Sequence, residues 1–77
     1  MNIKYFGEIA DITGQTAEVI VFQENSLETL LGYLKKNYQL SENDFYLAIN
    51  HQLADTTQNI QIADTDEVAI LSPFAGG

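Results

Sequence analysis

A chain of 77 residues, of which 45% are hydrophobic, is long enough for one small folded domain and too hydrophobic for a disordered segment. The absence of cysteine excludes a disulfide framework, a thiolate metal site, an iron–sulfur centre and a cysteine nucleophile. Eleven acidic residues against three lysines give a formal net charge of −8. This charge disfavours nucleic acid and anionic membranes as partners. It fits attraction to a basic partner or simple solubility equally well.

The sequence shows no targeting or membrane-spanning segment. The N-terminus, Met1–Lys4, lacks a basic region followed by an apolar one, as a signal peptide would have. No apolar run approaches the roughly 20 residues that a transmembrane helix needs. We therefore expect a cytoplasmic protein with no membrane partner.

The first part of the chain predicts two strands joined by a short connection. Asn2–Phe6 is rich in β-branched and aromatic residues, which favours a strand. Ala17–Phe22 is apolar on both faces, which predicts a strand covered on both sides. The connection between them, Gly7–Gly14, has room for a helical turn with Ile9 and Ile12 on one side.

The segment Asn25–Tyr38 has the clearest helical pattern. Ser26 can cap its N-terminus; alternatively, Asn25 caps it together with Glu28 in a variant of the capping box. Gly32 costs about 1 kcal/mol relative to alanine inside a helix, and we expect it to mark a close approach of a strand backbone. The apolar stripe recurs at helical spacing and comprises Leu27, Leu30, Leu31, Leu34 and Tyr38.

Further extended segments follow this helix. Phe45–Asn50 and Glu67–Leu71 read as strands, and Ile60 and Ile62 mark a brief extended piece after the polar loop Gln52–Asn59. The order β-β-α-β-(short β)-β predicts an α+β fold of the β-grasp, or ubiquitin-like, type, with a mixed sheet of four to five strands on one main helix. In such a sheet the last strand lies centrally beside the first, so any tail leaves from the middle of the sheet.

The side chains offer no convincing catalytic group. His51, the lone histidine, follows Asn50, and this pair most simply forms a turn. Asp64–Glu67 is acidic but lacks the spacing and glycine of a calcium-binding loop, so it reads as a turn into the last strand. Gly7 and Gly14 do not form a phosphate-binding pattern. We therefore expect no metal site and no bound cofactor.

The C-terminal segment Leu71–Gly77 (LSPFAGG) carries the strongest functional signal. Pro73 fixes its own φ and biases Ser72 toward extended backbone, so the segment should project from the domain. We therefore divide the chain into a β-grasp domain, residues 1–71, and a tail, residues 72–77. The alternatives are that the two final glycines are accidental or belong to a truncated linker.

The tail ends in a free α-carboxylate on glycine, a group that no side chain supplies. Without Cβ atoms, Gly76 and Gly77 can enter a narrow slot in another protein. The four residues Phe74–Gly77 reach at most about 14 Å when extended. Attack of the carboxylate on ATP would give an acyl adenylate, which a sulfur or amine nucleophile can open. This places the chemistry on the Gly77 carboxylate, with Gly76 and Ala75 as the inserting tail.

Several short motifs together resemble the small, sulfur-carrying subunit of molybdopterin synthase, and the resemblance covers the whole chain. The most specific element is the Pro-x-x-Gly-Gly ending, Pro73–Gly77, which follows a strand that begins Asp-Glu-Val-Ala. The other motifs are weak singly; they are Tyr5–Gly7, Glu8–Gly14, Ser26–Leu27, Ala48–Asn50 and Asp64–Ala69.

The resemblance implies a function as a carrier and co-substrate. An adenylating enzyme related to ubiquitin activators would use ATP to convert Gly77 to an acyl adenylate, and a sulfur donor would leave a thiocarboxylate there. The tail would enter the large synthase subunit, where the sulfur attacks a cyclic pyranopterin monophosphate. Members of this family form heterotetramers of two small and two large subunits. The catalytic side chains would belong to the large subunit.

Two positions depart from the family pattern. Ala10 stands where the family usually has arginine, so any salt bridge made there is lost or replaced. Asp64-Thr65 stands where Asp-Gly is common, which makes a turn with positive φ less favourable.

For the partner surface we choose Phe74 as the anchor, with Leu71, Pro73 and Phe6 beside it, because an aromatic next to a threading tail fits the pattern of binding hot spots. The alternative is that Phe6 and Leu71 fill the core, and for Phe6 this interpretation is the stronger one. Competing functions are a sulfur carrier of another, thiamin-type pathway, a ubiquitin-like modifier of lysines, and an inert interaction domain.

Overall fold

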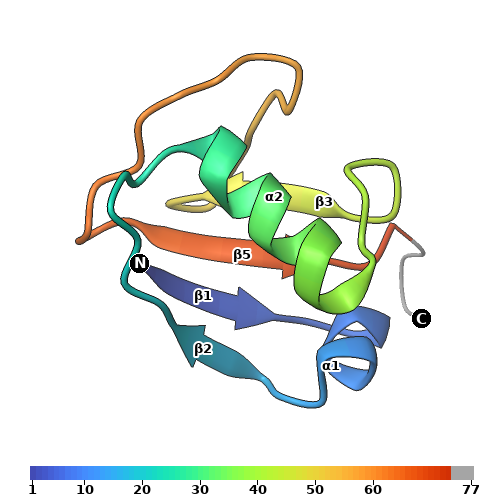
Figure 1. The fold of residues 1–77 in the computed structure, drawn as a ribbon. Coiled ribbons are helices and arrows are strands. Elements are labelled where there is room, and N and C mark those ends of the chain that lie inside the picture. The colour runs from blue at the N-terminus through green and yellow to red at the C-terminus, as the bar shows by residue number, and fades with distance from the viewer. Residues whose placement is uncertain (74–77) are drawn as a thin grey trace.

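The computed structural model describes residues 1–73 as a five-stranded sheet with one long helix across one face (Figure 1). The strands lie in the order β2-β1-β5-β3-β4. This arrangement confirms the predicted β-grasp fold. Within residues 1–73, no helix is both long and apolar enough to span a membrane.

The central strands pair as the sequence predicts. β1, Asn2–Tyr5, runs parallel to β5, Glu67–Leu71, and β3, Tyr46–Ile49, runs antiparallel to β5 on its other side. All three predicted strands are confirmed. One end of β1 and both ends of β3 are shifted by one residue, and β5 has the predicted bounds. β5 therefore lies between two neighbours and delivers the end of the domain from the middle of the sheet.

α2, Leu27–Tyr38, covers the sheet because its apolar stripe meets the inward side chains of the strands. Ser26 caps it by accepting a hydrogen bond from the Thr29 N–H at 3.2 Å, which confirms the first of the two predicted caps. The Asn25 amide instead donates to Asp64. The core, almost wholly apolar, is built from Ile3, Tyr5, Leu27, Leu30, Leu34, Leu47, Val68 and Ile70, among others.

The connection after β1 forms the short helix α1, Glu8–Thr13, as its pattern allowed. Gly14 ends it in the left-handed conformation, with φ 76°, and donates its N–H to the Ala10 carbonyl at 2.9 Å. Ala10 itself packs against the core.

Three expectations about local structure are wrong. β2, Ala17–Val19, is shorter than predicted and has one exposed face, because it lies at the sheet edge and α2 covers only one side. Apart from its neighbours in the helix, no atom lies within 4 Å of the position that a Cβ on Gly32 would take, so no strand approaches it. The short strand is β4, Gln52–Leu53, rather than the piece at Ile60 and Ile62.

The position of β4 follows from a two-residue turn. Asn50 and His51 both have positive φ, 53° and 70°, which is the geometry of a type I′ hairpin turn. This confirms the predicted turn and returns the chain at once beside β3. The segment around Gln61 instead makes a single bridge with Ser26, outside the sheet, while Ile62 is buried in the core.

Candidate functional site

The candidate site lies where β5 ends, at the centre of the sheet. The Phe6 N–H donates to the Ile70 carbonyl at 3.0 Å, which holds the end of β1 against β5. Beyond Leu71, Ser72 and Pro73 are half-buried. The predicted tail residues Phe74, Ala75, Gly76 and Gly77 lie outside the described residues.

The face of the sheet opposite α2 carries an exposed apolar surface beside this point. In register across the sheet, Tyr46 pairs with Leu71, and Ala69 pairs with Ala48, which in turn pairs with Leu53. Paired residues face the same side of a sheet, so these side chains form two adjacent rows. We call this surface, with Phe6 added, the tail-side patch; its residues are Phe6, Tyr46, Ala48, Leu53, Ala69 and Leu71.

Phe6 belongs to this patch rather than to the core. Its side chain is 46% exposed, whereas Ile3 and Tyr5 in β1 are buried under α2. Side chains alternate along a strand, so the residue after Tyr5 must face the open side. The stronger of our two interpretations for Phe6, core packing, is therefore wrong. Leu71 is half-buried, and it lines one shallow hollow together with Phe6 and Leu53.

Four members of the patch were missed in the sequence; Ala48 is buried at its base and Ala69 is half-buried, while Leu53 and Tyr46 are exposed. Leu53 is 73% exposed and Tyr46 is 55% exposed. The signal for Tyr46 was present, because the buried Leu47 beside it implies that Tyr46 faces the other way. Leu53 gave no such signal, since its place depends on the hairpin turn at Asn50 and His51.

Charged groups border the patch on the side of the β5 N-terminus. Glu67 accepts from the Lys4 ammonium at 2.8 Å, and His51 Nε2 lies 3.4 Å from the same carboxylate. The hydrogen bond and charge of Lys4 lower the pKa of Glu67. These groups give the patch a polar rim, as protein interfaces commonly have. His51 remains in a turn with an exposed side chain, as predicted.

The acidic turn before β5 is a structural element. Asp66 accepts from the Ala63 N–H at 2.8 Å and from the Asn50 amide at 2.9 Å, and the latter bond above all lowers the pKa of Asp66. Asp64 and Thr65 are not among the residues with positive φ, in agreement with the departure from Asp-Gly. Within residues 1–73, no group of three potential ligands could hold a metal ion.

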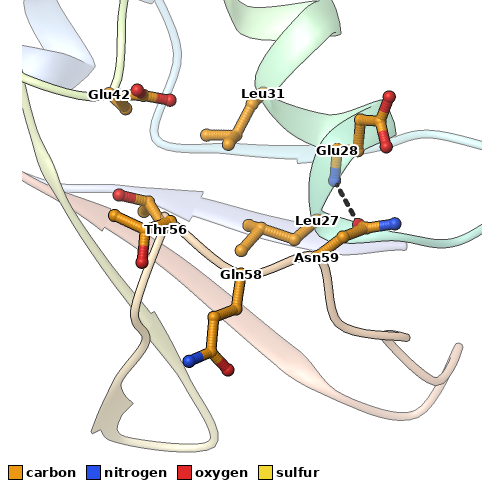
Figure 2. Close-up of a pocket in the computed structure, with 8 residues that line it drawn as sticks. Leu27, Glu28, Leu31, Glu42, Thr56, Gln58 and Asn59 are labelled. Atoms are coloured by element: carbon orange, nitrogen blue, oxygen red, sulfur yellow. Dashed lines mark hydrogen bonds between the residues drawn. The ribbon is translucent and has the colours of Figure 1, made fainter.

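A second hollow lies between the start of α2 and the loop around Gln58 (Figure 2). Leu27 and Leu31 form its apolar part, and the Glu28 N–H already donates to the Asn59 side chain at 2.9 Å. The carboxylates of Glu28 and Glu42 also line it. Of the two hollows, the one lined by Phe6, Leu53 and Leu71 lies on the tail-side patch, which is the candidate docking surface.

The fold agrees with comparisons to known proteins. The profile of the ThiS family matches residues 3–77. The chain belongs to this family. It is 33% identical to the molybdopterin synthase sulfur carrier subunit of Anopheles gambiae, over 91% of the chain and 80% of that protein.

Solved structures share the fold at lower identity. One is subunit 1 in the complex of subunits 1 and 2 of molybdopterin-converting factor from Helicobacter pylori, with a TM-score of 0.71, 24% identity and coverage of 99% and 96% of the two chains. Another is small archaeal modifier protein SAMP1 from Haloferax volcanii, with a TM-score of 0.71, 19% identity and coverage of 99% and 97%. The ubiquitin-like fold is thus common to carriers and modifiers.

Proposed function

We propose that this protein is the sulfur carrier of a molybdopterin synthase. The observation that carries the proposal is the place where β5 ends, since this central strand ends beside the exposed tail-side patch. The 33% identity to a molybdopterin synthase sulfur carrier subunit supports the same function. Three of the motifs that suggested this family, Tyr5–Gly7, Ala48–Asn50 and Asp64–Ala69, overlap β1, β3 and β5, which build that surface.

In the proposed cycle the Gly77 carboxylate is the reacting group. A carboxylate oxygen attacks the α-phosphorus of ATP on an adenylating enzyme, and pyrophosphate leaves. Hydrosulfide, or a donor group at the same oxidation level, then attacks the acyl carbon and AMP leaves, which gives a thiocarboxylate. In the large subunit the sulfur passes to a cyclic pyranopterin monophosphate, and water returns Gly77 to a carboxylate.

The tail-side patch would hold the domain on the large subunit while the tail enters its active site. Phe74, Pro73, Leu71 and Phe6 are the proposed contacts, and Gly76 and Ala75 the part that inserts. We propose an assembly of two small and two large subunits, as the resemblance to the small subunit of molybdopterin synthase implies, in which the large subunits supply the catalytic side chains. Adenylation requires the same tail, so the activating enzyme and the large subunit would bind in turn.

Deletion of Gly77 tests the function directly. In the host, this deletion should abolish molybdopterin formation, measured as loss of molybdoenzyme activity. The purified variant should unfold at the same temperature as the full chain, because residues 1–73 hold the core. Restored activity with the intact gene is the control. Full molybdoenzyme activity in the deletion strain would contradict the proposal.

Because an archaeal modifier shares the fold, a second candidate function is that of a protein modifier joined to lysines. Intact-mass measurement of protein purified from its host separates the two. A carrier shows an oxygen-to-sulfur replacement at the C-terminus, whereas a modifier leaves isopeptide-linked adducts on other proteins. Loss of thiamin synthesis in the deletion strain, with molybdopterin unaffected, would indicate a thiamin-type carrier.

A further inference from the structure

The outer edge of the sheet is a strand with exposed apolar side chains. β2 stands first in the sheet order, so within residues 1–73 no strand covers its outer side. Val19 is 75% exposed and Val21, just after β2, is 93% exposed. Edge strands are usually protected by lysine, proline or a bulge. The outward positions here carry Ala17, Val19 and Val21 instead.

The hydrogen bonds between β1 and β2 fix which backbone groups point outward. The Tyr5 N–H donates to the Thr16 carbonyl at 2.9 Å, and the Ile20 N–H donates to the Met1 carbonyl at 3.0 Å. In an antiparallel pair the residues that face the neighbour alternate, so residues 16, 18 and 20 face β1. The N–H and C=O groups of residues 17, 19 and 21 therefore point away from the sheet and can pair with an added strand.

The helix side of β2 carries a fixed carboxylate among aromatic rings. Glu18 accepts hydrogen bonds from the hydroxyls of Tyr5 at 2.7 Å, Tyr33 at 2.5 Å and Tyr38 at 2.9 Å. The ring of Phe22 lies edge-to-face on Tyr33, with centroids 5.6 Å apart. Because these side chains hold one another in place, little ordering is needed when a strand is added.

The charges near the β2 edge indicate what kind of peptide segment would bind there. Residues 5–34 contain five acidic residues and no lysine, arginine or histidine. The two cations beside β2 lie on its inner side and have partners: the Met1 ammonium donates to the Ile20 carbonyl, and Lys4, opposite Ala17, pairs with Glu67. A second copy of the chain would bring two such segments together, and like charges oppose that contact. A cationic segment would instead find a complementary surface. The acidic residues are Glu8, Asp11, Glu18, Glu24 and Glu28.

We propose that the β2 edge binds an extended, cationic segment of a partner protein as an additional strand. Its lysine or arginine side chains would lie on the helix side, near Glu18 and the faces of Tyr33 and Tyr38. Its apolar side chains would pack on Val19 and Val21 on the open side. β1 separates this edge from β5 (Figure 1), so the tail-side patch stays available at the same time. The inference does not depend on the proposed sulfur chemistry.

Amide hydrogen exchange on the full chain tests the added strand. The probe is a capped peptide of alternating valine and lysine, seven residues long by design, so roughly the length of a short strand. On binding, exchange should slow at Ala17, Val19 and Val21 and change little at Glu18 and Ile20. A peptide with glutamate in place of lysine is the control, and it should not bind.

Variants of the protein separate backbone pairing from charge. Val19→Pro removes an outward N–H that β1 does not use, and it should weaken the peptide about tenfold. In case this variant folds poorly, the double variant Val19→Thr with Val21→Thr keeps the strand propensity and should weaken it about fivefold. Glu18→Gln should weaken it about threefold at low salt. Leu53→Thr in the tail-side patch is the matched control and should have no effect.

Three results would overturn the proposal. One is equal binding of the glutamate peptide, because the edge would then not select charge. Another is protection of the amides around Phe6 and Leu53 in place of β2. The third is slowed amide exchange at alternate residues of β2 that appears without peptide and increases with protein concentration. This result would identify a second copy of the chain as the occupant.

Discussion

The two faces of the sheet carry apolar side chains for different purposes. On the covered face, Val68 and Ile70 of β5 are fully buried beneath α2, while Ala69 and Leu71 of the same strand face the open side. The open face has no helix across it in the described chain, yet it carries Phe6, Tyr46 and Leu53. An exposed cluster of this kind marks a binding surface more often than it stabilises a fold. The comparison therefore predicts that substitutions on the two faces have separate consequences.

The largest effect on folding is expected on the covered face. Leu34→Ala removes a side chain with 0% exposure and should lower the free energy of unfolding by about 2–5 kcal/mol. Leu53→Ala, the same change on the open face, should alter it by less than about 1 kcal/mol. Denaturant unfolding of both variants measures the contrast. Similar losses in the two variants would mean that the open face also holds the fold together.

The next largest effect concerns binding, and it is expected on the open face rather than on the covered face. Phe6→Ala should weaken binding to the large synthase subunit by about 2 kcal/mol, roughly thirtyfold, if Phe6 is an interface anchor. Ile60→Ala, an exposed apolar residue outside the tail-side patch, is the control. Calorimetric titration measures both. Unchanged affinity for the Phe6 variant would remove Phe6 from the proposed contacts.

A smaller effect tests how α2 is anchored over the covered face. Ser26→Ala removes the acceptor of the Thr29 N–H and should cost about 1 kcal/mol of unfolding free energy. Asn25→Ala should cost less, because Asn25 bonds to Asp64 rather than to the helix backbone. Thermal unfolding compares the two variants. A larger loss of stability in the Asn25 variant would contradict this and favour the alternative cap, in which Asn25 forms a capping box with Glu28.

The smallest effects are two pH dependences, and the first concerns Glu18 at the β2 edge of the covered face. Partial burial favours the neutral form of Glu18, but the hydrogen bonds from Tyr33, Tyr5 and Tyr38 outweigh it and lower the Glu18 pKa below 4.5. A carboxyl with a lowered pKa in the folded state stabilises the fold above pH about 4.5 and loses this contribution as the pH falls further. Glu18→Gln should therefore flatten the stability curve on the acid side.

The tyrosines give the opposite dependence at high pH. Burial and then the bond to Glu18 raise the pKa of Tyr5. Its folded form thus keeps the proton while the unfolded chain ionises, and stability falls above pH about 10. Tyr5→Phe should reduce this loss, as followed by circular dichroism between neutral and alkaline pH. An unchanged alkaline slope would mean that other groups control it.

The sequence by itself determined the elements whose signal is local. The apolar spacing of Leu27, Leu30 and Leu34 fixed α2, because only a helix brings such residues to one face. The β-branched residues of β1 and β5, with the single long helix between them, fixed the β-grasp order and the central place of β5. The Pro-x-x-Gly-Gly ending fixed where to look for function, although its last residues lie outside the described part of the chain.

Only the tertiary structure decided which apolar residues are exposed. Ala17–Phe22 reads as a strand covered on both sides, but an edge position leaves Val19 and Val21 in solvent. Phe6 reads as core, yet strand alternation turns it to the face that α2 does not reach. The bonds of Glu18 join β1, β2 and α2 across 13 to 20 residues of sequence. Alternation along a strand is a local pattern, but which of the two faces is covered depends on what lies beside a residue in space.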